Sequence, residues 1–164
     1  MRYVVGIFII VGIFICSLTT SRREVKEYYS ERELVELARP YETENIPVEL
    51  IVGLILTESR GYVFAKSPEP ASCCGLTQLH PNTAKELGVQ NIWDVNENIE
   101  GGVKYLQMMM NMFGSEELSL SAYNQGPGAL RRNNYRPYPI TQRYVEKVLN
   151  ETERIRQLII DENL

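Results

Sequence analysis

The sequence has little cysteine, little positive charge and no acidic residue before Glu24. Three cysteines in 164 residues are too few to hold a fold together by a disulfide framework. With 17 Lys and Arg against 21 Asp and Glu, the net charge of −4 argues against the basic surface that a nucleic-acid partner requires. The rest of the composition is ordinary, because a hydrophobic share of 44% and a charged share of 23% are typical of one globular domain.

The longest apolar run lies at the N-terminus. Between Arg2 and Arg22, the 19 residues of Tyr3–Ser21 carry no charge. A helix of this length spans about 28 Å, which matches the hydrocarbon core of a bilayer. We therefore predict one N-terminal transmembrane helix, an uncleaved signal anchor over residues 1–22 that contacts the inner membrane through residues 3–21. A cleaved secretory signal and a buried core helix are the alternatives.

Charge alone does not decide on which side of the membrane the rest of the chain lies. Arg22, Arg23 and Lys26 follow the apolar run, whereas Arg2 and the amino terminus precede it. A count of positive charges places the C-terminal part inside the cell. Residues 1–22 carry two positive charges, so the remaining chain has a net charge of −6.

Helix start and stop signals recur after Glu24, while the strict alternation of a β-strand is almost absent. Ser30 and Glu33 form a capping box, and proline or glycine marks most of the expected helix ends. The expected helices run from Ser30 to Pro40, Pro47 to Gly61, Pro81 to Gly88, Asn96 to Gly114, Pro127 onward, and Ile140 to Ile160. No internal repeat is present, so we predict a compact, mostly α domain.

One carboxylate is predicted on the apolar face of its helix. Glu58 follows Leu54 by four residues and Ile55 by three, so it shares their face. It also lies in the last turn, where the helix dipole disfavours a negative charge. Burial and the dipole both favour the protonated form, so we expect a raised pKa and a group that can act as a general acid. The alternative is a helix-end side chain that turns out to water.

Two glycine-containing segments carry side chains that suit a sugar ligand. Gly75–Leu79 lies in a loop before a helix, and Ala122–Gly128 is predicted to be a second loop. Each combines glycine with amide, hydroxyl or aromatic groups, and tyrosine rings beside amides match the apolar faces and hydroxylated rim of a sugar. The alternative is that Asn and Gly only form turns there.

These segments occur in a fixed order with other short motifs. The set comprises Glu58-Ser59, Gly75–Leu79 with Thr77 in the place of Met, Asn98-Ile99 with Tyr105-Leu106, Ala122–Gly126, and Tyr144-Val145. Together they resemble the catalytic domain of lytic transglycosylases, which is related to goose-type lysozyme, over roughly residues 38–150. The resemblance implies a lysozyme-like helical domain over residues 38–164, preceded by a linker and first helix at residues 23–37.

The resemblance also implies a reaction, in which Glu58 is the single catalytic acid/base. Glu58 would protonate the glycosidic oxygen between N-acetylmuramic acid and N-acetylglucosamine in peptidoglycan glycan strands. The substrate's own N-acetyl group would stabilise the positive charge, and the ionised Glu58 would take a proton from the C6 hydroxyl to close a 1,6-anhydro ring. An ordinary retaining glycosidase needs two carboxylates instead. Neither a metal nor an organic cofactor is implied.

Motif position assigns a set of substrate-binding residues. They are Ser59, Ser67, Gln78, His80, Tyr123, Asn124 and Tyr144. Within this set, Gln78, Tyr123 and Asn124 are expected to line the sugar cleft, and Tyr144 is expected to position Glu58.

The chain departs from the family pattern just before the second motif. In the family, a serine before this motif hydrogen-bonds the catalytic Glu. The corresponding segment here, Ser67–Cys74, is longer than usual, so Ser67 and Ser72 are both candidates for that role. His80 stands where the family commonly has Met. Cys73 and Cys74 could form a vicinal disulfide, stay reduced or only pack.

The predicted protein is a peptidoglycan lytic transglycosylase anchored in the inner membrane, with its catalytic domain facing the periplasm where the substrate lies. A hydrolase of the same bond is an alternative that would need a second carboxylate, for which Asp94, Glu97 and Glu100 are candidates. A non-catalytic glycan-binding or assembly protein on this fold is another. The sequence identifies no cell-envelope or phage assembly partner, and it leaves wall remodelling, secretion and phage lysis or entry open as cellular roles.

Overall fold

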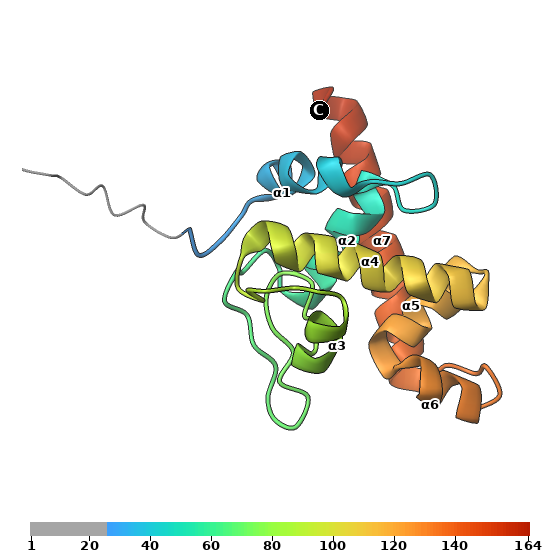
Figure 1. The fold of residues 1–164 in the computed structure, drawn as a ribbon. Coiled ribbons are helices and arrows are strands. Elements are labelled where there is room, and N and C mark those ends of the chain that lie inside the picture. The colour runs from blue at the N-terminus through green and yellow to red at the C-terminus, as the bar shows by residue number, and fades with distance from the viewer. Residues whose placement is uncertain (1–25) are drawn as a thin grey trace, which may run out of the picture.

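The computed structural model describes residues 26–164, so the predicted membrane helix over residues 1–22 lies outside the described residues. The described part is helical, and its strand-type pairing is confined to isolated bridges in the loops (Figure 1). Its elements are α1 (Glu31–Ala38), the 3₁₀ turn η1 (Arg39–Tyr41), α2 (Val48–Glu58), α3 (Pro81–Glu86), α4 (Val95–Phe113), α5 (Glu116–Gln125), α6 (Pro127–Arg132) and α7 (Pro139–Glu162). The prediction of a mostly α domain is confirmed.

All six predicted helices are present, with small shifts at their ends. The helix predicted from Asn96 begins at Val95, because the Asp94 side chain accepts a hydrogen bond from Glu97 N at 3.0 Å and caps the helix. It ends at Gly114, whose φ of 73° is in the left-handed region that glycine favours. Among residues 26–164, no helix combines the length and the apolar character needed to cross a membrane.

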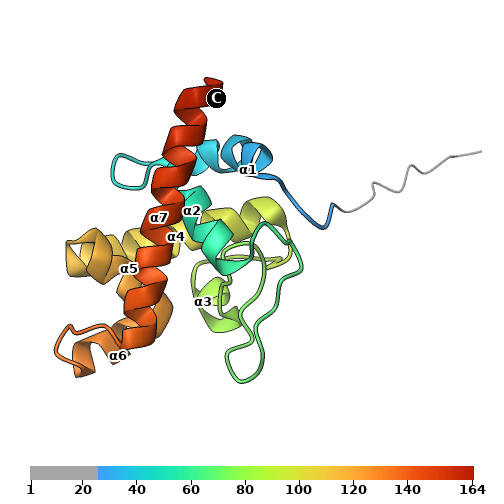
Figure 2. The ribbon, with the colours of Figure 1, turned by 180° about the vertical axis from the view of Figure 1, so that it is seen from behind.

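Helix α2 forms the centre of the domain. Residues 50–56 are all buried, and Leu50, Ile51, Leu54 and Ile55 have no exposed surface. A helix that is apolar on nearly every side is expected to be surrounded by other elements. Helices α1 and α7 pack against it, and Figure 2 shows α7 running beside α2.

Helices α2 and α7 form the most extensive helix contact of the described chain. A Cβ at Gly53 of α2 would lie 2.5 Å from Thr152 Oγ1 and 2.8 Å from Thr152 N of α7. The two backbones can approach this closely only because residue 53 has no side chain. The contact brings the C-terminal end of α2 next to the first turns of α7.

One prediction about local structure is wrong. Residues 122–125 were predicted in a loop, but they form the last turn of α5, and the chain turns only at Gly126. The helix was missed because it has no apolar stripe. Ser119 and Ser121 occupy buried positions in it, and their hydroxyls donate to Ser115 O and Glu117 O inside the helix, each at 2.6 Å.

Candidate active site

Glu58 is the last residue of α2. The hydroxyl of Tyr144, in α7, donates a hydrogen bond to Glu58 Oε1 at 2.6 Å. Burial raises the pKa of Glu58 to about 7, although the Tyr144 hydrogen bond and the Lys147 ammonium lower it in part. A carboxyl with a pKa near neutrality can both give and take a proton at physiological pH, as an acid/base must.

Lys147 follows Tyr144 by about one turn of α7 and reaches the same end of α2. Its Nζ donates to the carbonyl oxygen of Thr57 at 3.4 Å. That carbonyl belongs to the last turn of α2, where backbone acceptors have no partner inside the helix. The C-terminal end of a helix carries a partial negative charge, which disfavours an ionised Glu58. The positive charge of Lys147 offsets this effect. Two side chains of α7 therefore hold the end of α2, one on the carboxylate and one on the backbone.

Four of the predicted substrate-binding residues line one pocket of about 230 Å³. The residues that line it are Cys73, Gln78, Leu79, His80, Thr83, Tyr105, Tyr123, Asn124, Gln125 and Gly126. Burial first, and the nearby Glu58 carboxylate in addition, raise the pKa of the Cys73 thiol and of the Tyr123 hydroxyl. The pocket therefore lies within the electrostatic range of Glu58, between the loop before α3 and the end of α5.

Gln78 lines the pocket with an amide whose N–H groups are already bonded. Its backbone has a φ of 48°, which is uncommon for a residue other than glycine. Its Nε2 donates to Ala65 O and Gly75 O, both at 2.9 Å. Both N–H groups of the amide are used by these bonds, so Oε1 is the atom that Gln78 can offer to a ligand.

A single buried side chain of α4 holds the loop that carries this wall of the pocket. Asn98 Oδ1 accepts from Thr77 N at 2.9 Å and lies 2.9 Å from the Thr77 hydroxyl. Its Nδ2 donates to Cys74 O at 3.0 Å and to Ile92 O at 2.9 Å. A Cβ at Gly75 would lie 2.2 Å from Asn98 Nδ2, so the loop needs glycine there. The loop is therefore tightly fixed against α4.

The opposite wall comes from α5. The Tyr123 hydroxyl donates to Thr77 O at 2.8 Å, and its ring centroid lies 5.0 Å from that of Tyr105. Asn124 Oδ1 accepts from the Thr141 hydroxyl at 3.0 Å, which leaves the Asn124 amide N–H groups as donors. The pocket thus combines an acceptor amide from the loop before α3, a donor amide from α5 and the rings of two tyrosines. An acetamido group or a row of sugar hydroxyls has the complementary chemistry.

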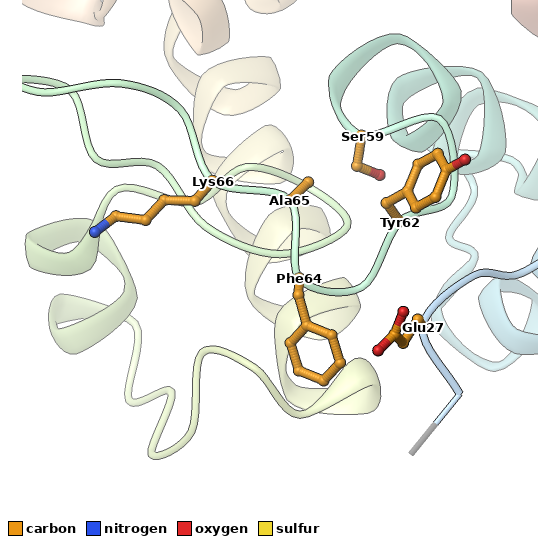
Figure 3. Close-up of a pocket in the computed structure, with 6 residues that line it drawn as sticks. All are labelled: Glu27, Ser59, Tyr62, Phe64, Ala65 and Lys66. Atoms are coloured by element: carbon orange, nitrogen blue, oxygen red, sulfur yellow. The ribbon is translucent and has the colours of Figure 1, made fainter. Parts of the chain in front are cut away.

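Ser59 lies outside this pocket. Its hydroxyl donates to Ile55 O at 3.1 Å and accepts from Gly61 N at 3.2 Å, so it ties the end of α2 to the turn that follows. It contributes to a second pocket, of about 440 Å³, which Figure 3 shows. That pocket is lined by Glu27, Ser59, Tyr62, Phe64, Ala65 and Lys66.

Among the described residues, neither of the other two serines makes a hydrogen bond to the Glu58 carboxylate. Ser67 Oγ accepts a hydrogen bond from Cys73 N at 2.8 Å. The Ser72 hydroxyl is buried and has no hydrogen-bond partner among residues 26–164. Within the same residues, the hydrogen bond to Glu58 comes from Tyr144. Neither serine takes the place expected for a serine that bonds the catalytic Glu.

The remaining polar candidates lie at helix starts. His80 precedes α3, and its Nδ1 accepts from Asn82 N at 3.2 Å while the ring lines the pocket. Asp94 caps α4, and Glu97 Oε2 accepts from Gln90 N at 2.6 Å. The candidates for a second carboxylate are therefore held at the start of α4, and none of them is among the residues that line the pocket.

A family model of the transglycosylase SLT domain matches residues 37–143, which is more than half of the chain. The chain belongs to the transglycosylase SLT family. The matched part of this SLT domain contains Glu58 and the whole pocket, while Tyr144 is the next residue after it.

Known proteins similar to this SLT domain are considerably longer. A transglycosylase of Enterobacteria phage PRD1 is 37% identical over 82 residues, which are 50% of this chain and 30% of the phage protein. The 70 kDa soluble lytic transglycosylase SLT70 from Escherichia coli matches with a TM-score of 0.64 and 28% identity, over 76% of this chain and 24% of that structure. An inactive mutant of lytic transglycosylase Slt from Pseudomonas aeruginosa matches with a TM-score of 0.64 and 26% identity, over 77% of this chain and 24% of that structure.

The chain therefore spans less than a third of the phage protein and about a quarter of each solved enzyme. The likeness confirms the predicted lytic transglycosylase fold for the helical part.

Three residues that shape the pocket of the SLT domain were not predicted to do so. Asn98 and Tyr105 belong to motifs of the resemblance, but the motifs do not indicate that one clamps a loop and the other stacks on Tyr123. The one sequence signal for Asn98 is that its amide lies within the apolar stripe of a helix. Thr141 has no local signal, because its role depends on how α7 packs beside α5. Thr77 stands where the family motif has Met, and its hydroxyl contacts Asn98, which explains this departure.

The two cysteines near the pocket are free thiols. Cys74 is buried, and Cys73 lines the pocket. Residues 26–164 contain no group of three or more His, Cys, Asp and Glu side chains that could hold a metal ion.

Proposed function

We propose that this SLT domain is a peptidoglycan lytic transglycosylase and that Glu58 is its single acid/base. The observation that carries the proposal is a partly buried carboxyl with a pKa of about 7, held at 2.6 Å by the Tyr144 hydroxyl beside a pocket of amides and tyrosine rings. Both protonation states of such a carboxyl are accessible near neutral pH, which one residue needs if it is acid and base in turn.

In the first step, protonated Glu58 gives its proton to the glycosidic oxygen, and the bond between that oxygen and C1 of N-acetylmuramic acid breaks. The substrate's N-acetyl oxygen stabilises the charge that develops at C1. Glu58 is then ionised, and the Tyr144 hydroxyl stabilises the carboxylate through its hydrogen bond.

In the second step, ionised Glu58 takes the proton of the C6 hydroxyl, whose oxygen bonds to C1 and closes the 1,6-anhydro ring. No water is consumed, and Glu58 returns to its protonated state. We propose that Gln78, Tyr123 and Asn124 hold the sugar during both steps, with His80 at the rim of the same pocket. Ser59 and Ser67 act indirectly, since their hydroxyls are bonded to the backbone beside the site.

A hydrolase would need a second carboxylate to activate water. The candidates for that role are engaged at the start of α4, where Glu97 accepts from Gln90 N and Glu100 pairs with Lys104 at 2.6 Å. This placement supports the transglycosylase reaction over hydrolysis.

Product analysis on purified sacculi tests the proposal. The wild-type chain should release muropeptides with 1,6-anhydro ends, which mass spectrometry distinguishes because hydrolysis products are heavier by one water. Glu58→Gln keeps the size of the side chain but cannot supply the proton, so release should fall by at least about 10³-fold.

Glu49→Gln is the matched control, because Glu49 lies at the other end of α2 and pairs with Arg156 at 3.1 Å. It should retain wild-type release. Anhydro products that persist in Glu58→Gln would contradict the proposal. Wild-type products that carry the extra water would favour a hydrolase, and sacculus binding without any cleavage would favour a glycan-binding protein.

We further propose that residues 1–22 anchor the enzyme in the inner membrane with the SLT domain in the periplasm. The uncharged run of Tyr3–Ser21 supports an anchor, and the location of peptidoglycan supports this orientation over the one that Arg22 and Arg23 favour. A topology reporter fused after Leu164 should be active only outside the cytoplasm. A reporter that is active in the cytoplasm would overturn the orientation.

A further inference from the structure

Several aromatic side chains are exposed where the described chain begins. In the segment after α2, Tyr62 and Phe64 are 54% and 48% exposed, whereas Val63 between them is 2% exposed. Tyr28 is 46% exposed, and its ring centroid lies 5.2 Å from that of Tyr62. The ring of Trp93, which is partly buried, lies 6.1 Å from that of Phe64. We call Tyr28, Tyr62, Phe64 and Trp93 the aromatic face.

The backbone under the aromatic face is fixed. Tyr29 N donates to Gly61 O at 3.0 Å, and Val63 N donates to Glu27 O at 2.9 Å. At Gly61, with a φ of 86°, a Cβ would lie 2.4 Å from Tyr29 O, so the two segments meet at a point that needs glycine. The first residues of the described chain therefore lie directly beside the loop after α2.

The proposed reaction does not use these rings. Two of them, Tyr62 and Phe64, line the pocket of about 440 Å³. In that pocket, Figure 3 shows Phe64 and Glu27 on one side and Ser59 on the other, with the Lys66 side chain directed away. Tyr62 and Phe64 point outward on either side of the buried Val63, so their rings do not contribute to the core. A cluster of exposed apolar side chains on a small domain indicates an interaction surface.

The sequence places this surface close to the proposed anchor. Six residues separate Ser21, the end of the uncharged run, from Tyr28. They span at most about 20 Å when fully extended. Three of them, Arg22, Arg23 and Lys26, are basic and two, Glu24 and Glu27, are acidic, so the segment carries a net positive charge of one toward a membrane that contains anionic lipid. A bilayer that holds the uncharged run is therefore within reach of the aromatic face.

We propose that the aromatic face docks on the periplasmic surface of the inner membrane, with its rings at the level of the lipid headgroups. Tyrosine and tryptophan favour this layer because each ring has an apolar body and a polar tip. Among the described residues, Glu27 is the one acid that lines the pocket beside these rings, so little negative charge opposes their approach to the lipid. This inference rests on the proposed anchor but not on the proposed reaction.

Docking in this way would orient the active site. In both views, α6 lies on the opposite side of the domain from the blue segment that begins the described chain (Figures 1 and 2). Gly126, where α6 begins, lines the sugar pocket. A domain held by its aromatic face therefore turns the α6 side of the pocket away from the lipid and toward the cell wall.

Fluorescence of the full-length chain in vesicles of phosphatidylethanolamine and phosphatidylglycerol tests the inference. Flotation of the vesicles first establishes that the chain is anchored. Trp93 is the only tryptophan, so its emission reports on the aromatic face alone. Lipids that carry bromine near the headgroup end of their acyl chains quench tryptophan on contact. We expect a loss of Trp93 emission in brominated vesicles relative to matched vesicles without bromine.

The double variant Tyr62→Ser, Phe64→Ser should still float but lose this quenching. The matched control is Tyr135→Ser with Tyr138→Ser, since these rings are 55% and 43% exposed and lie next to α6 and the start of α7. That control should be quenched like the wild type. The ratio between brominated and plain vesicles cancels any direct effect of a substitution on Trp93 emission.

Each result is decisive. A wild-type chain that floats without quenching of Trp93 overturns the docking and leaves the anchor intact. A chain that does not float overturns the anchor and the docking together. Neither result bears on the reaction, which the release of anhydro-muropeptides by the detergent-solubilised chain measures separately.

Discussion

At the scale of single residues, the Glu58 carboxyl proposed as the acid/base also affects the stability of the fold. The pKa of Glu58 is raised by burial from 4.5 to about 7 in the folded chain. Below pH 4.5 both the folded and the unfolded chain hold this proton, so the group has no effect on stability. As the pH rises from 4.5 to 7, the unfolded chain releases the proton first, and folding loses stability across that window. At neutral pH and above, the site costs the fold about 3 kcal/mol.

Replacing the carboxyl should recover this free energy. We expect Glu58→Gln to raise the free energy of unfolding by about 3 kcal/mol near pH 8 and to change it little near pH 4. Urea denaturation at both values of pH measures the difference. An equal change at the two values would show that the ionisation of Glu58 is not responsible.

The Tyr144 hydrogen bond should tune the pH dependence of the reaction. This bond favours the ionised form of Glu58, so its loss raises the pKa of that carboxyl further. In Tyr144→Phe, the alkaline limb of the pH–rate profile should therefore move up by about half a unit to one unit, with a lower maximal rate. Rates of anhydro-muropeptide release across pH test this. Tyr138→Phe, an exposed position before α7, is the control and should leave the limb unchanged.

At the scale of helices, the sequence is sufficient to predict where most of them begin and end. Capping residues, prolines and glycines mark six helices because they act locally. Helical spacing also predicts that Glu58 shares the face of buried residues, and it lies at the end of α2 as expected. Helix α5 is not predictable in this way, because serines that bond to their own helix replace the apolar stripe. The meeting of Asn124 with Thr141 depends on the packing of distant segments, which no local pattern encodes.

The contact between α2 and α7 should be intolerant of a single methyl group. Alanine favours a helix over glycine by up to about 1 kcal/mol, but in Gly53→Ala the new Cβ would meet the Thr152 backbone at 2.8 Å. We expect a net loss of about 2–3 kcal/mol in the free energy of unfolding. Thermal or urea denaturation measures it.

Gly128→Ala is the matched control within a helix. The nearest atom to its new Cβ would be Arg132 Nη1 at 3.3 Å, at the end of a flexible side chain. This variant should be as stable as the wild type or slightly more stable. Equal effects of the two substitutions would show that close packing of α7 does not depend on Gly53.

At the scale of the whole molecule, the negative net charge opposes binding to an acidic cell wall. The chain after residue 22 has a net charge of −6. A membrane anchor raises the local concentration of the enzyme near its substrate without any attraction between charges. The proposed anchor would therefore favour contact with the wall, while the negative charge of the domain opposes it. A change in salt concentration alters only the effect of charge.

Binding to sacculi should not weaken as salt is added. Raising the ionic strength from about 0.01 M to about 0.15 M shortens the Debye length from about 30 Å to about 8 Å, which screens repulsion between an acidic domain and an acidic wall. We expect sedimentation of the chain with sacculi to stay constant or increase over this range. A clear decrease would indicate an attractive ionic contact and would contradict this account.

The contact between Tyr144 and Glu58 also has a consequence for when the proposed active site is complete. The two residues are 86 positions apart, and the tyrosine is in the last helix of the described chain. A chain still on the ribosome can have completed α2 while α7 has yet to emerge, so its carboxyl has neither its tyrosine nor the helix that fixes it. The proposed site is therefore complete only once α7 has folded against α2.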